Sequence, residues 1–291
     1  MNPWILAIRP KTLAAGITPV IIGSAIAYGD GLFHLPSALA CLTGALLIQI
    51  ATNLSNDYFD FKKGADANRI GPARVTQAGL IKSQLVLFTA LLAFVLAGLI
   101  SLYLIDRAGM SIAIIAAAAI ISGLLYTAGP RPLGYLGLGE LFVFIFFGPV
   151  AVGATYFVQT LDLNWAVVIA GFAPGFLSCA ILAVNNLRDI DGDRRAGKMT
   201  LAVRWGRSFA ISEYLFCLMA ASFVPVLVFL ITADHEGIIL AAVVSFLAIP
   251  TIRTVMTTLD PHALTHALAQ TSRWLFLYSI IFSLGWILCS R

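Results

Sequence analysis

Nine apolar segments, each close to the length that crosses a lipid bilayer, occupy most of this chain. A transmembrane helix needs roughly 20 predominantly apolar residues. The segments lie at residues 12–29, 36–55, 84–105, 110–128, 136–158, 164–187, 211–232, 236–257 and 271–289. Only 11% of the residues are charged, against about 25% in a soluble domain. We therefore predict an all-α, polytopic membrane protein with nine transmembrane helices, formed as a single domain over residues 1–291.

The basic residues are divided unevenly between the two sides that nine crossings would create. When the loops are numbered alternately from the N-terminal tail, 16 of the 18 lysines and arginines fall in one set, and only Arg107 and Arg291 fall in the other. Cytoplasmic loops carry the excess of basic residues in membrane proteins. We expect the N-terminus in the cytoplasm, the C-terminus on the opposite side, and the protein in the cell (inner) membrane. A net charge of only +4 gives no support for nucleic-acid binding.

Two clusters of carboxylate and amide side chains stand at the cytoplasmic ends of the second and sixth segments. Each precedes a long basic connection, expected at about 56–83 and 188–210. At about 100° per residue, the polar residues of each cluster share one helical face. The shared faces carry Asn53, Asn56, Asp57 and Asp60 in the first cluster, and Asn185, Asp189 and Asp193 in the second. Asp191 is turned about 200° from Asp189, so it should point away unless Gly192 ends the helix first.

The clustered carboxylates require a cation. They repel one another, and their ionised form is costly at the edge of a membrane. Mg²⁺ suits hard oxygen ligands and is usually shared with substrate phosphates. The same regions supply amides and basic side chains for the outer oxygens of a diphosphate. This predicted diphosphate-binding set is Asn53, Lys62, Lys63, Arg69, Arg74, Asn185, Arg194 and Lys198.

Two other interpretations of the clusters stay open on this evidence. Solvated helix ends with charged loops would need no ligand, although two clusters of the same layout disfavour that explanation. A cation-coupled transporter could use the acids as ion ligands, but transporters usually place such acids near the bilayer midplane. Strictly Mg²⁺-dependent release of diphosphate would exclude a transporter.

Five stretches of the chain resemble motifs of the UbiA-type intramembrane aromatic prenyltransferase superfamily, and most of all its branch that acts on 1,4-dihydroxy-2-naphthoate. They are residues 9–12, 56–66, 69–79, 126–140 and 185–201. The resemblance implies nine helices around a central cavity, with the two acidic clusters facing each other under a cytoplasmic cap. It also implies a Mg²⁺ site. The implied metal ligands are the catalytic carboxylates Asp57, Asp60, Asp189 and Asp193, together with Asp66.

The same resemblance implies the reaction. A polyprenyl chain passes from its diphosphate to the naphthoate ring, with loss of CO₂ and diphosphate, to give demethylmenaquinol in menaquinone biosynthesis. A sister enzyme with another acceptor, such as 4-hydroxybenzoate, or another donor, such as phytyl diphosphate, is the main alternative. One departure from the superfamily pattern is Gly64, which stands where many members have a third aspartate, so that Asp66 is the next acid. The residues themselves support the metal and diphosphate half of the reaction, and the aromatic acceptor rests on the resemblance.

Three further residues are candidates for binding the aromatic acid. Glu140 lies near the start of a predicted span, where an ionisable residue is functional by default, although a helix N-terminal charge is the alternative. Tyr126 and Arg131 lie in the loop rich in Gly and Pro that would cap the cavity. The parallel placing of the two clusters also suggests an internal duplication of a four-helix unit, helices 1–4 and 5–8, followed by helix 9.

Overall fold

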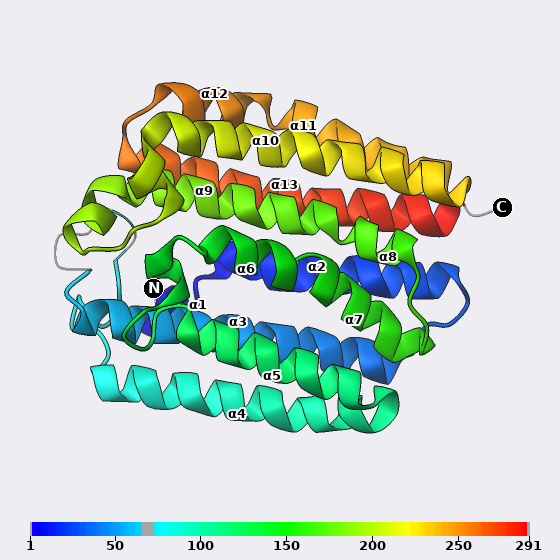
Figure 1. Cartoon of the computed structure of the whole chain (residues 1–291), viewed down its shortest axis with the longest axis horizontal. Helices are drawn as coiled ribbons and strands as arrows, with labels where there is room; N and C mark the ends of the chain where they lie inside the picture. Colours follow the sequence, from blue (N-terminus) through cyan, green and yellow to red (C-terminus); the bar gives the residue numbers. More distant parts are fainter. Residues whose placement is uncertain (1, 66–70, 72, 290–291) are drawn as a thin grey trace.

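The computed structural model describes residues 2–65, 71 and 73–289, so that Asp66, Arg69 and Arg291 lie outside the described residues. The elements are α1 (Pro3–Ile8), α2 (Pro10–Gly29), α3 (Leu35–Lys62), α4 (Ser83–Ala108), α5 (Met110–Leu125), η1 (Leu133–Leu136), α6 (Gly139–Phe146), α7 (Pro149–Thr160), α8 (Trp165–Ala170), α9 (Phe172–Arg195), α10 (Leu201–Thr232), η2 (Glu236–Val243), α11 (Val244–Leu247), α12 (Ile249–Thr257) and α13 (Pro261–Leu288). Every regular element in the described part of the chain is helical, and the long helices lie side by side as a bundle (Figure 1). The all-α prediction is confirmed.

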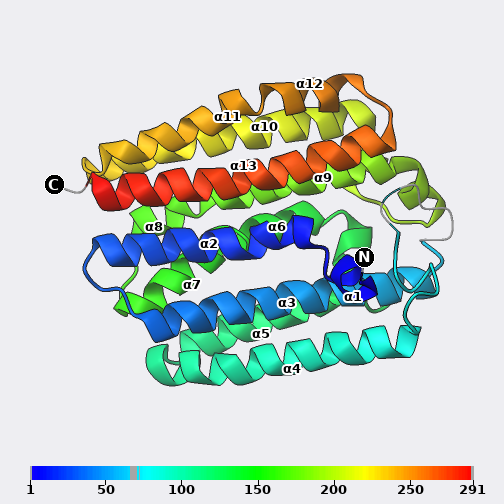
Figure 2. The same cartoon turned by 180° about the vertical axis from the view of Figure 1, so that it is seen from behind.

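All nine predicted spans are helical, but they are unequal in length. Eight helical segments are long and apolar enough to cross a bilayer, and α5 is a shorter apolar helix of 16 residues. At 1.5 Å per residue α5 is about 24 Å long, a few ångströms less than a hydrocarbon core of about 30 Å. The start of α2 and the end of α13 lie at opposite ends of the bundle (Figures 1 and 2), as an odd number of crossings requires.

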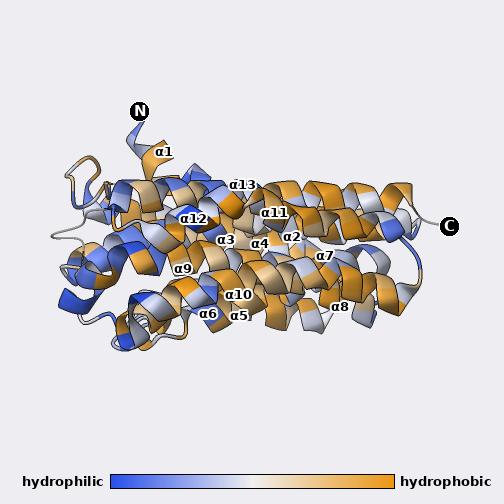
Figure 3. Cartoon of the chain, turned by 90° about the horizontal axis from the view of Figure 1, so that it is seen from above, coloured by the Kyte–Doolittle hydropathy of each residue, from blue (hydrophilic) through white to orange (hydrophobic). Residues whose placement is uncertain are grey.

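The outer surface of the bundle is apolar along most of its length, and the hydrophilic residues gather mainly towards the ends (Figure 3). Large side chains such as Phe88, Phe216, Phe223 and Phe246 are exposed on it. A continuous apolar surface of this extent would be unstable in water and suits lipid. The protein is therefore a multi-pass membrane protein.

The predicted connections after the second and sixth spans start too early in the sequence, because α3 and α9 extend beyond the apolar residues. α3 continues to Lys62 and α9 continues to Arg195, so both acidic clusters are helical. α10 begins at Leu201, where the Thr200 hydroxyl accepts a hydrogen bond from the amide of Val203. Gly206 (φ 82°) then kinks it, so the long part of α10 begins after Gly206, close to the predicted start at residue 211. Hydropathy marks where the lipid ends, whereas capping marks where the helix ends.

Spans five and six are each interrupted, and the interruptions lie against each other. α6 ends before Gly148 and α8 ends at Gly171. A Cβ atom on Gly148 would lie 2.7 Å from the carbonyl oxygen of Gly171, and one on Gly171 would lie 2.6 Å from Cα of Pro149. Only glycine allows backbones this close. Broken helices are tolerated in a membrane where protein surrounds the break.

α9 is the most enclosed span. In the most apolar part of the span that α8 and α9 form together, 72% of the residues are buried, against 11% for α3. α10 and α13 pack along it, and between them the hydroxyl of Tyr214 lies 3.1 Å from that of Thr271. The first half of α9, residues 172–184, is apolar on all sides, and such a helical segment belongs in the interior. The two cluster-bearing helices therefore differ, because α9 is set in the core and α3 lies closer to the surface.

Candidate active site

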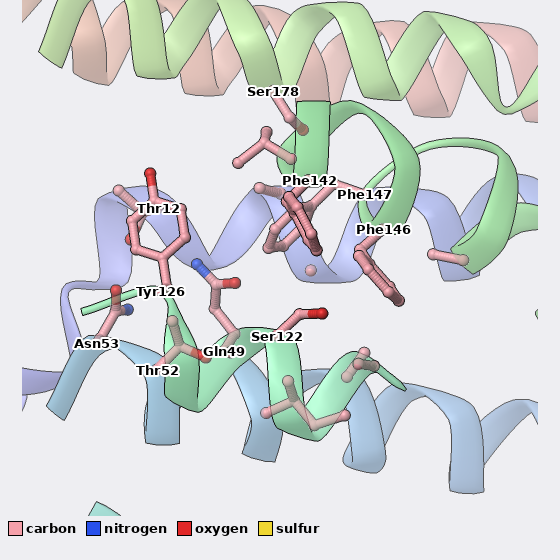
Figure 4. A pocket seen from close by; sticks show the side chains of 18 of the residues that line it. Thr12, Gln49, Thr52, Asn53, Ser122, Tyr126, Phe142, Phe146, Phe147 and Ser178 are labelled. Atoms are coloured by element: carbon pink, nitrogen blue, oxygen red, sulfur yellow. The ribbon is translucent and has the colours of Figure 1, made fainter. Parts of the chain in front are cut away.

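A cavity of about 340 Å³ lies between α2, α3, α5, α6, α7 and α9. Its wall near the basic end of the bundle is polar. The polar lining there includes Asn53, Asn56, Asp60, Tyr126, Asn185, Asn186, Asp189 and Lys198. Figure 4 shows Tyr126 and Asn53 on this side, with Phe142, Phe146 and Phe147 further along the wall. The cavity therefore joins a polar head to an apolar channel.

The apolar channel runs deep into the membrane region. Along α3 alone the lining extends from Asp60 to Cys41, a rise of about 28 Å at 1.5 Å per residue. Its far part is lined by small and aliphatic side chains, such as Ala116, Ala154 and Ile115. A long hydrocarbon chain with a charged head would match this change of polarity.

Asp57 is committed to the backbone of the neighbouring loop. Its carboxylate oxygens accept hydrogen bonds from the amides of Val75 and Thr76, at 3.2 and 3.0 Å, and the residue is 1% exposed. Buried amides need such acceptors. Asp57 thus fixes the position of residues 74–76 beside the cavity, which its place in the cluster did not predict.

Asp60 faces the cavity and connects two loops to α3. Its Oδ1 accepts a hydrogen bond from the Tyr135 hydroxyl at 3.0 Å, and its Oδ2 lies 3.4 Å from Nη2 of Arg74. Arg74 also lines the cavity. The predicted carboxylate and the predicted cation therefore meet, and Tyr135 is a partner that spacing in the sequence could not reveal.

The two amides of the first cluster hold neighbouring segments in place. Asn53 donates from Nδ2 to the main-chain carbonyl of Ile8 at 2.9 Å. The main-chain carbonyl of Asn53 accepts from the Arg9 guanidinium at 3.3 Å. Arg9 has a left-handed backbone (φ 57°) at the junction between α1 and α2. Asn56 accepts from the Thr127 hydroxyl at 2.8 Å. These contacts position α1 and the loop after α5 around the polar head of the cavity.

The lysines at the end of α3 take different positions. Lys62 is exposed and lies over the ring of Tyr58. Lys63 donates to the carbonyls of Thr127 and Gly129, at 2.8 and 3.1 Å, and lies over the ring of Tyr135. Partial burial lowers the pKa of the Lys63 ammonium, and the Asp60 carboxylate opposes this effect. Lys63 therefore ties the loop after α5 to the first cluster.

In the second cluster the acids are divided by helical face, as the spacing predicts. Asp189 lines the cavity, whereas the Asp191 side chain is 81% exposed and lies 4.0 Å from Arg194. Gly192 does not end the helix. Asp193 is buried, and its carboxylate lies 3.7 Å from the Lys198 ammonium. Arg194 is itself 59% exposed, outside the cavity.

Arg188 is the main feature of this cluster that the sequence analysis missed. Its guanidinium donates to both carboxylate oxygens of Asp189, at 2.8 and 2.7 Å, and to the side-chain oxygen of Asn185 at 2.8 Å. The side chain is only 3% exposed. Its position between Asn185 and Asp189 on one helix was the signal available in the sequence.

The three candidates for the aromatic acid lie at different distances from the cavity. Tyr126 lines it. Glu140 accepts a hydrogen bond from Nδ2 of Asn186 at 2.8 Å, and Asn186 lines the cavity. Arg131 is exposed and does not contribute to the lining of the described cavity. The structure thus brings Tyr126 and, through Asn186, Glu140 to the cavity.

The oxygen donors at the polar head fit a magnesium ion that is shared with a substrate. Among the described residues, no three carboxylate, imidazole or thiol groups come together closely enough to hold a metal by themselves. Asp60 from α3 and Asp189 from α9 both open onto the cavity. Mg²⁺ usually takes one or two carboxylates, with waters and substrate phosphates completing its shell.

The fold and this site define an integral membrane protein with a deep cavity between its helices, acidic at one end and apolar at the other. The UbiA prenyltransferase family matches residues 17–280, and the chain belongs to that family. It is similar to the 1,4-dihydroxy-2-naphthoate octaprenyltransferase of Escherichia coli (strain K12), with 37% identity covering 97% of this chain and 94% of the relative. The enzyme of the same name from Mycobacterium tuberculosis is 40% identical over 70% of each chain.

Solved structures share the fold. A UbiA homologue from Archaeoglobus fulgidus, solved with bound DMAPP and Mg²⁺, superposes with a TM-score of 0.68 at 16% identity, over 96% of this chain and 99% of that one. The resemblance to the superfamily that the motifs indicated is confirmed. At this identity the structural likeness concerns the fold alone.

Proposed function

We propose that this chain transfers a polyprenyl chain from its diphosphate to 1,4-dihydroxy-2-naphthoate, with release of CO₂ and diphosphate, in menaquinone biosynthesis. The relatives from Escherichia coli and Mycobacterium tuberculosis that carry this activity in their names support the acceptor. The observation that carries the proposal is the cavity itself, because it places Asp60 and Asp189 at the head of a deep apolar channel. A cation-coupled transporter has no comparable support from the family.

The two acidic clusters would hold the metal and the diphosphate. Asp60 and Asp189 are the carboxylates that open onto the cavity, and Asp57 and Asp193 lie directly behind them in the same clusters. Bound there, Mg²⁺ would neutralise the diphosphate as a leaving group. Whether Asp66 contributes stays a prediction, because it lies outside the described residues. Lys198 and Arg74 line the cavity and can bind outer phosphate oxygens.

The proposed reaction breaks one carbon–oxygen bond and forms one carbon–carbon bond. The bond between the prenyl C1 and the diphosphate oxygen breaks with its electron pair on the oxygen. The naphthoate ring supplies the electrons for the new carbon–carbon bond, and loss of CO₂ returns an electron pair to the ring. Phe142, Phe146 and Phe147 line the wall beyond the polar head (Figure 4). An apolar wall excludes water from an electron-poor allylic carbon.

The acceptor can be tested through the mass of the product. Purified protein should be incubated with Mg²⁺, a polyprenyl diphosphate and a panel of aromatic acids, and the products should be read by mass spectrometry. We expect a naphthoate product lighter by one CO₂ than the simple prenyl adduct. Prenylated 4-hydroxybenzoate that keeps its carboxylate, without any naphthoate product, would instead identify the sister enzyme.

We also propose that the end of the bundle holding the acidic clusters faces the cytoplasm. It carries the basic loops, whereas Arg107 at the other end is used to cap α7, since it donates to the carbonyls of Val158 and Gln159. In a protein lacking native cysteines, new cysteines at the exposed Lys62 and Arg195 should resist an impermeant thiol reagent in intact cells. A cysteine at Asp162, exposed at the opposite end, should react. Labelling with the reverse pattern would overturn the orientation.

A further inference from the structure

Arg188 forms an ion pair with Asp189, whose carboxylate the proposed metal site needs. The guanidinium forms a bidentate ion pair with Asp189, in which Nε donates to Oδ1 at 2.8 Å and Nη2 donates to Oδ2 at 2.7 Å. Nη2 also donates to Oδ1 of Asn185 at 2.8 Å. Bidentate, charge-assisted pairs of this geometry are among the strongest polar contacts in proteins. Both Asp189 and Asn185 line the cavity, so the pair stands at its wall.

The guanidinium is held from outside its own helix as well. Nη1 lies 3.4 Å from the Thr265 hydroxyl on α13. On another side, a Cβ added to Gly71 would lie 3.1, 3.1 and 3.2 Å from Nε, Cζ and Nη2. The Gly71 backbone is therefore close enough to the guanidinium that a side chain at this position would meet it. Arg188 is therefore fixed between three parts of the chain, and its side chain is 3% exposed.

The two acidic clusters are neutralised to different degrees. Asp60 has its nearest arginine contact at 3.4 Å, through a single nitrogen of Arg74. Asp189 has two shorter contacts from one guanidinium. A metal ion would need the same Asp189 oxygens, and two cations beside one carboxylate repel each other. Tight pairing with Arg188 and direct coordination of a metal by Asp189 are therefore in competition.

We propose that Arg188 is the resting counter-ion of Asp189, and that binding of the metal-bound prenyl diphosphate displaces it onto the diphosphate oxygens. In the resting protein the guanidinium offsets the negative charge of Asp189 at the edge of the membrane, where an isolated carboxylate is costly. In the occupied protein the same guanidinium neutralises phosphate charge, which suits its planar array of donors. This inference rests on the proposed function, because it presumes a diphosphate in the cavity.

The test uses Mn²⁺ as a probe that can be titrated alone. Free Mn²⁺ is measured by electron paramagnetic resonance with purified wild type and Arg188→Gln, first without substrate and then with geranyl S-thiodiphosphate. We expect Arg188→Gln to bind Mn²⁺ alone roughly tenfold more tightly, because one positive charge beside the Asp189 carboxylate is removed. It should bind the thiodiphosphate roughly tenfold more weakly. Arg253→Gln, which removes an exposed charge from α12, should change neither affinity.

Equal or weaker Mn²⁺ binding by Arg188→Gln would overturn the proposal, because a merely structural arginine does not compete with a metal. Arg188→Lys keeps the charge and loses the bidentate geometry. Its Mn²⁺ affinity should therefore lie between those of the wild type and of Arg188→Gln. If Arg188→Gln does not fold, an unchanged Mn²⁺ affinity in Arg188→Lys overturns the proposal instead. A failure of the proposed function is recognised separately: with the thiodiphosphate present, Asp189→Asn would bind Mn²⁺ as tightly as wild type.

Discussion

Replacing Asp189 or Asp193 by asparagine should lower kcat/KM by about 10²-fold or more, which corresponds to roughly 3 kcal/mol or above of lost transition-state stabilisation. Asparagine keeps the shape of the side chain and removes a negative charge that would attract the metal ion. Asp189 lines the cavity, and Asp193 lies on the same helical face, 3.7 Å from Lys198. The measurement is steady-state prenyl transfer by purified variants at saturating Mg²⁺.

Asp191→Asn is the matched control for this prediction. It makes the same chemical change two residues away on the same helix, but the Asp191 side chain is 81% exposed and pairs with Arg194 outside the cavity. We expect a loss of less than about tenfold, under 1.4 kcal/mol. Equal losses at all three positions would show that helical facing does not decide function here. Full activity in Asp189→Asn would remove the main support for a diphosphate enzyme.

The second large effect is expected at Asp60. Asp60→Asn should also lose about 10²-fold or more in kcat/KM, because it is the carboxylate of α3 that opens onto the cavity. Thermal stability should fall by less than in Asp57→Asn, because the amide oxygen can still accept from Tyr135 and the ion pair that is lost is a single long contact with Arg74. Activity and melting temperature are measured on the same detergent-purified samples.

Asp57→Asn should behave differently, although it lies on the same face of the same helix. Both of its oxygens accept from buried amides, those of Val75 and Thr76. Asparagine has one acceptor oxygen, so one amide loses its partner, at a cost of about 1–3 kcal/mol. A lower melting temperature and faster hydrogen exchange at residues 75 and 76 should accompany any loss of activity. If Asp57→Asn is as stable as wild type while Asp60→Asn unfolds, the two roles have been assigned the wrong way round.

The features that follow from the pattern of apolar and polar residues, namely the spans and the polar face of α9, could be predicted from the sequence. The nine apolar segments are helical, and the face of α9 that carries Asp189 and Asp193 was found from 3.6-residue spacing alone. Helix ends could not be found this way. Asp260 starts α13 by capping it, ten residues before the apolar segment begins. Thr200 caps a short helical segment that the kink at Gly206 separates from the long part of α10. The proposed internal duplication stays a prediction, as does a role for Asp66.

The contacts between distant segments were the part that spacing could not supply. Tyr135 reaches Asp60 across 75 positions, and Lys63 reaches the carbonyl of Thr127 across 64. Those partners follow from how α3, α9 and the loops meet at one end of the bundle. Arg188 differs, because its partners Asn185 and Asp189 lie within one turn of the helix. The i,i+3 spacing predicts the contact with Asn185, whereas adjacent residues such as Arg188 and Asp189 usually point to different sides of a helix, so their ion pair could not be predicted from spacing.

The central claim is that the carboxylates of α3 and α9 bind one metal–diphosphate group at the head of the cavity. An experimental structure of the protein with Mn²⁺ and geranyl S-thiodiphosphate, with the metal located by anomalous scattering, tests it most directly. The claim predicts metal density in contact with an oxygen of Asp60 and an oxygen of Asp189, with the diphosphate beside it and the prenyl chain in the apolar channel. A bound thiodiphosphate whose metal contacts neither aspartate would contradict it.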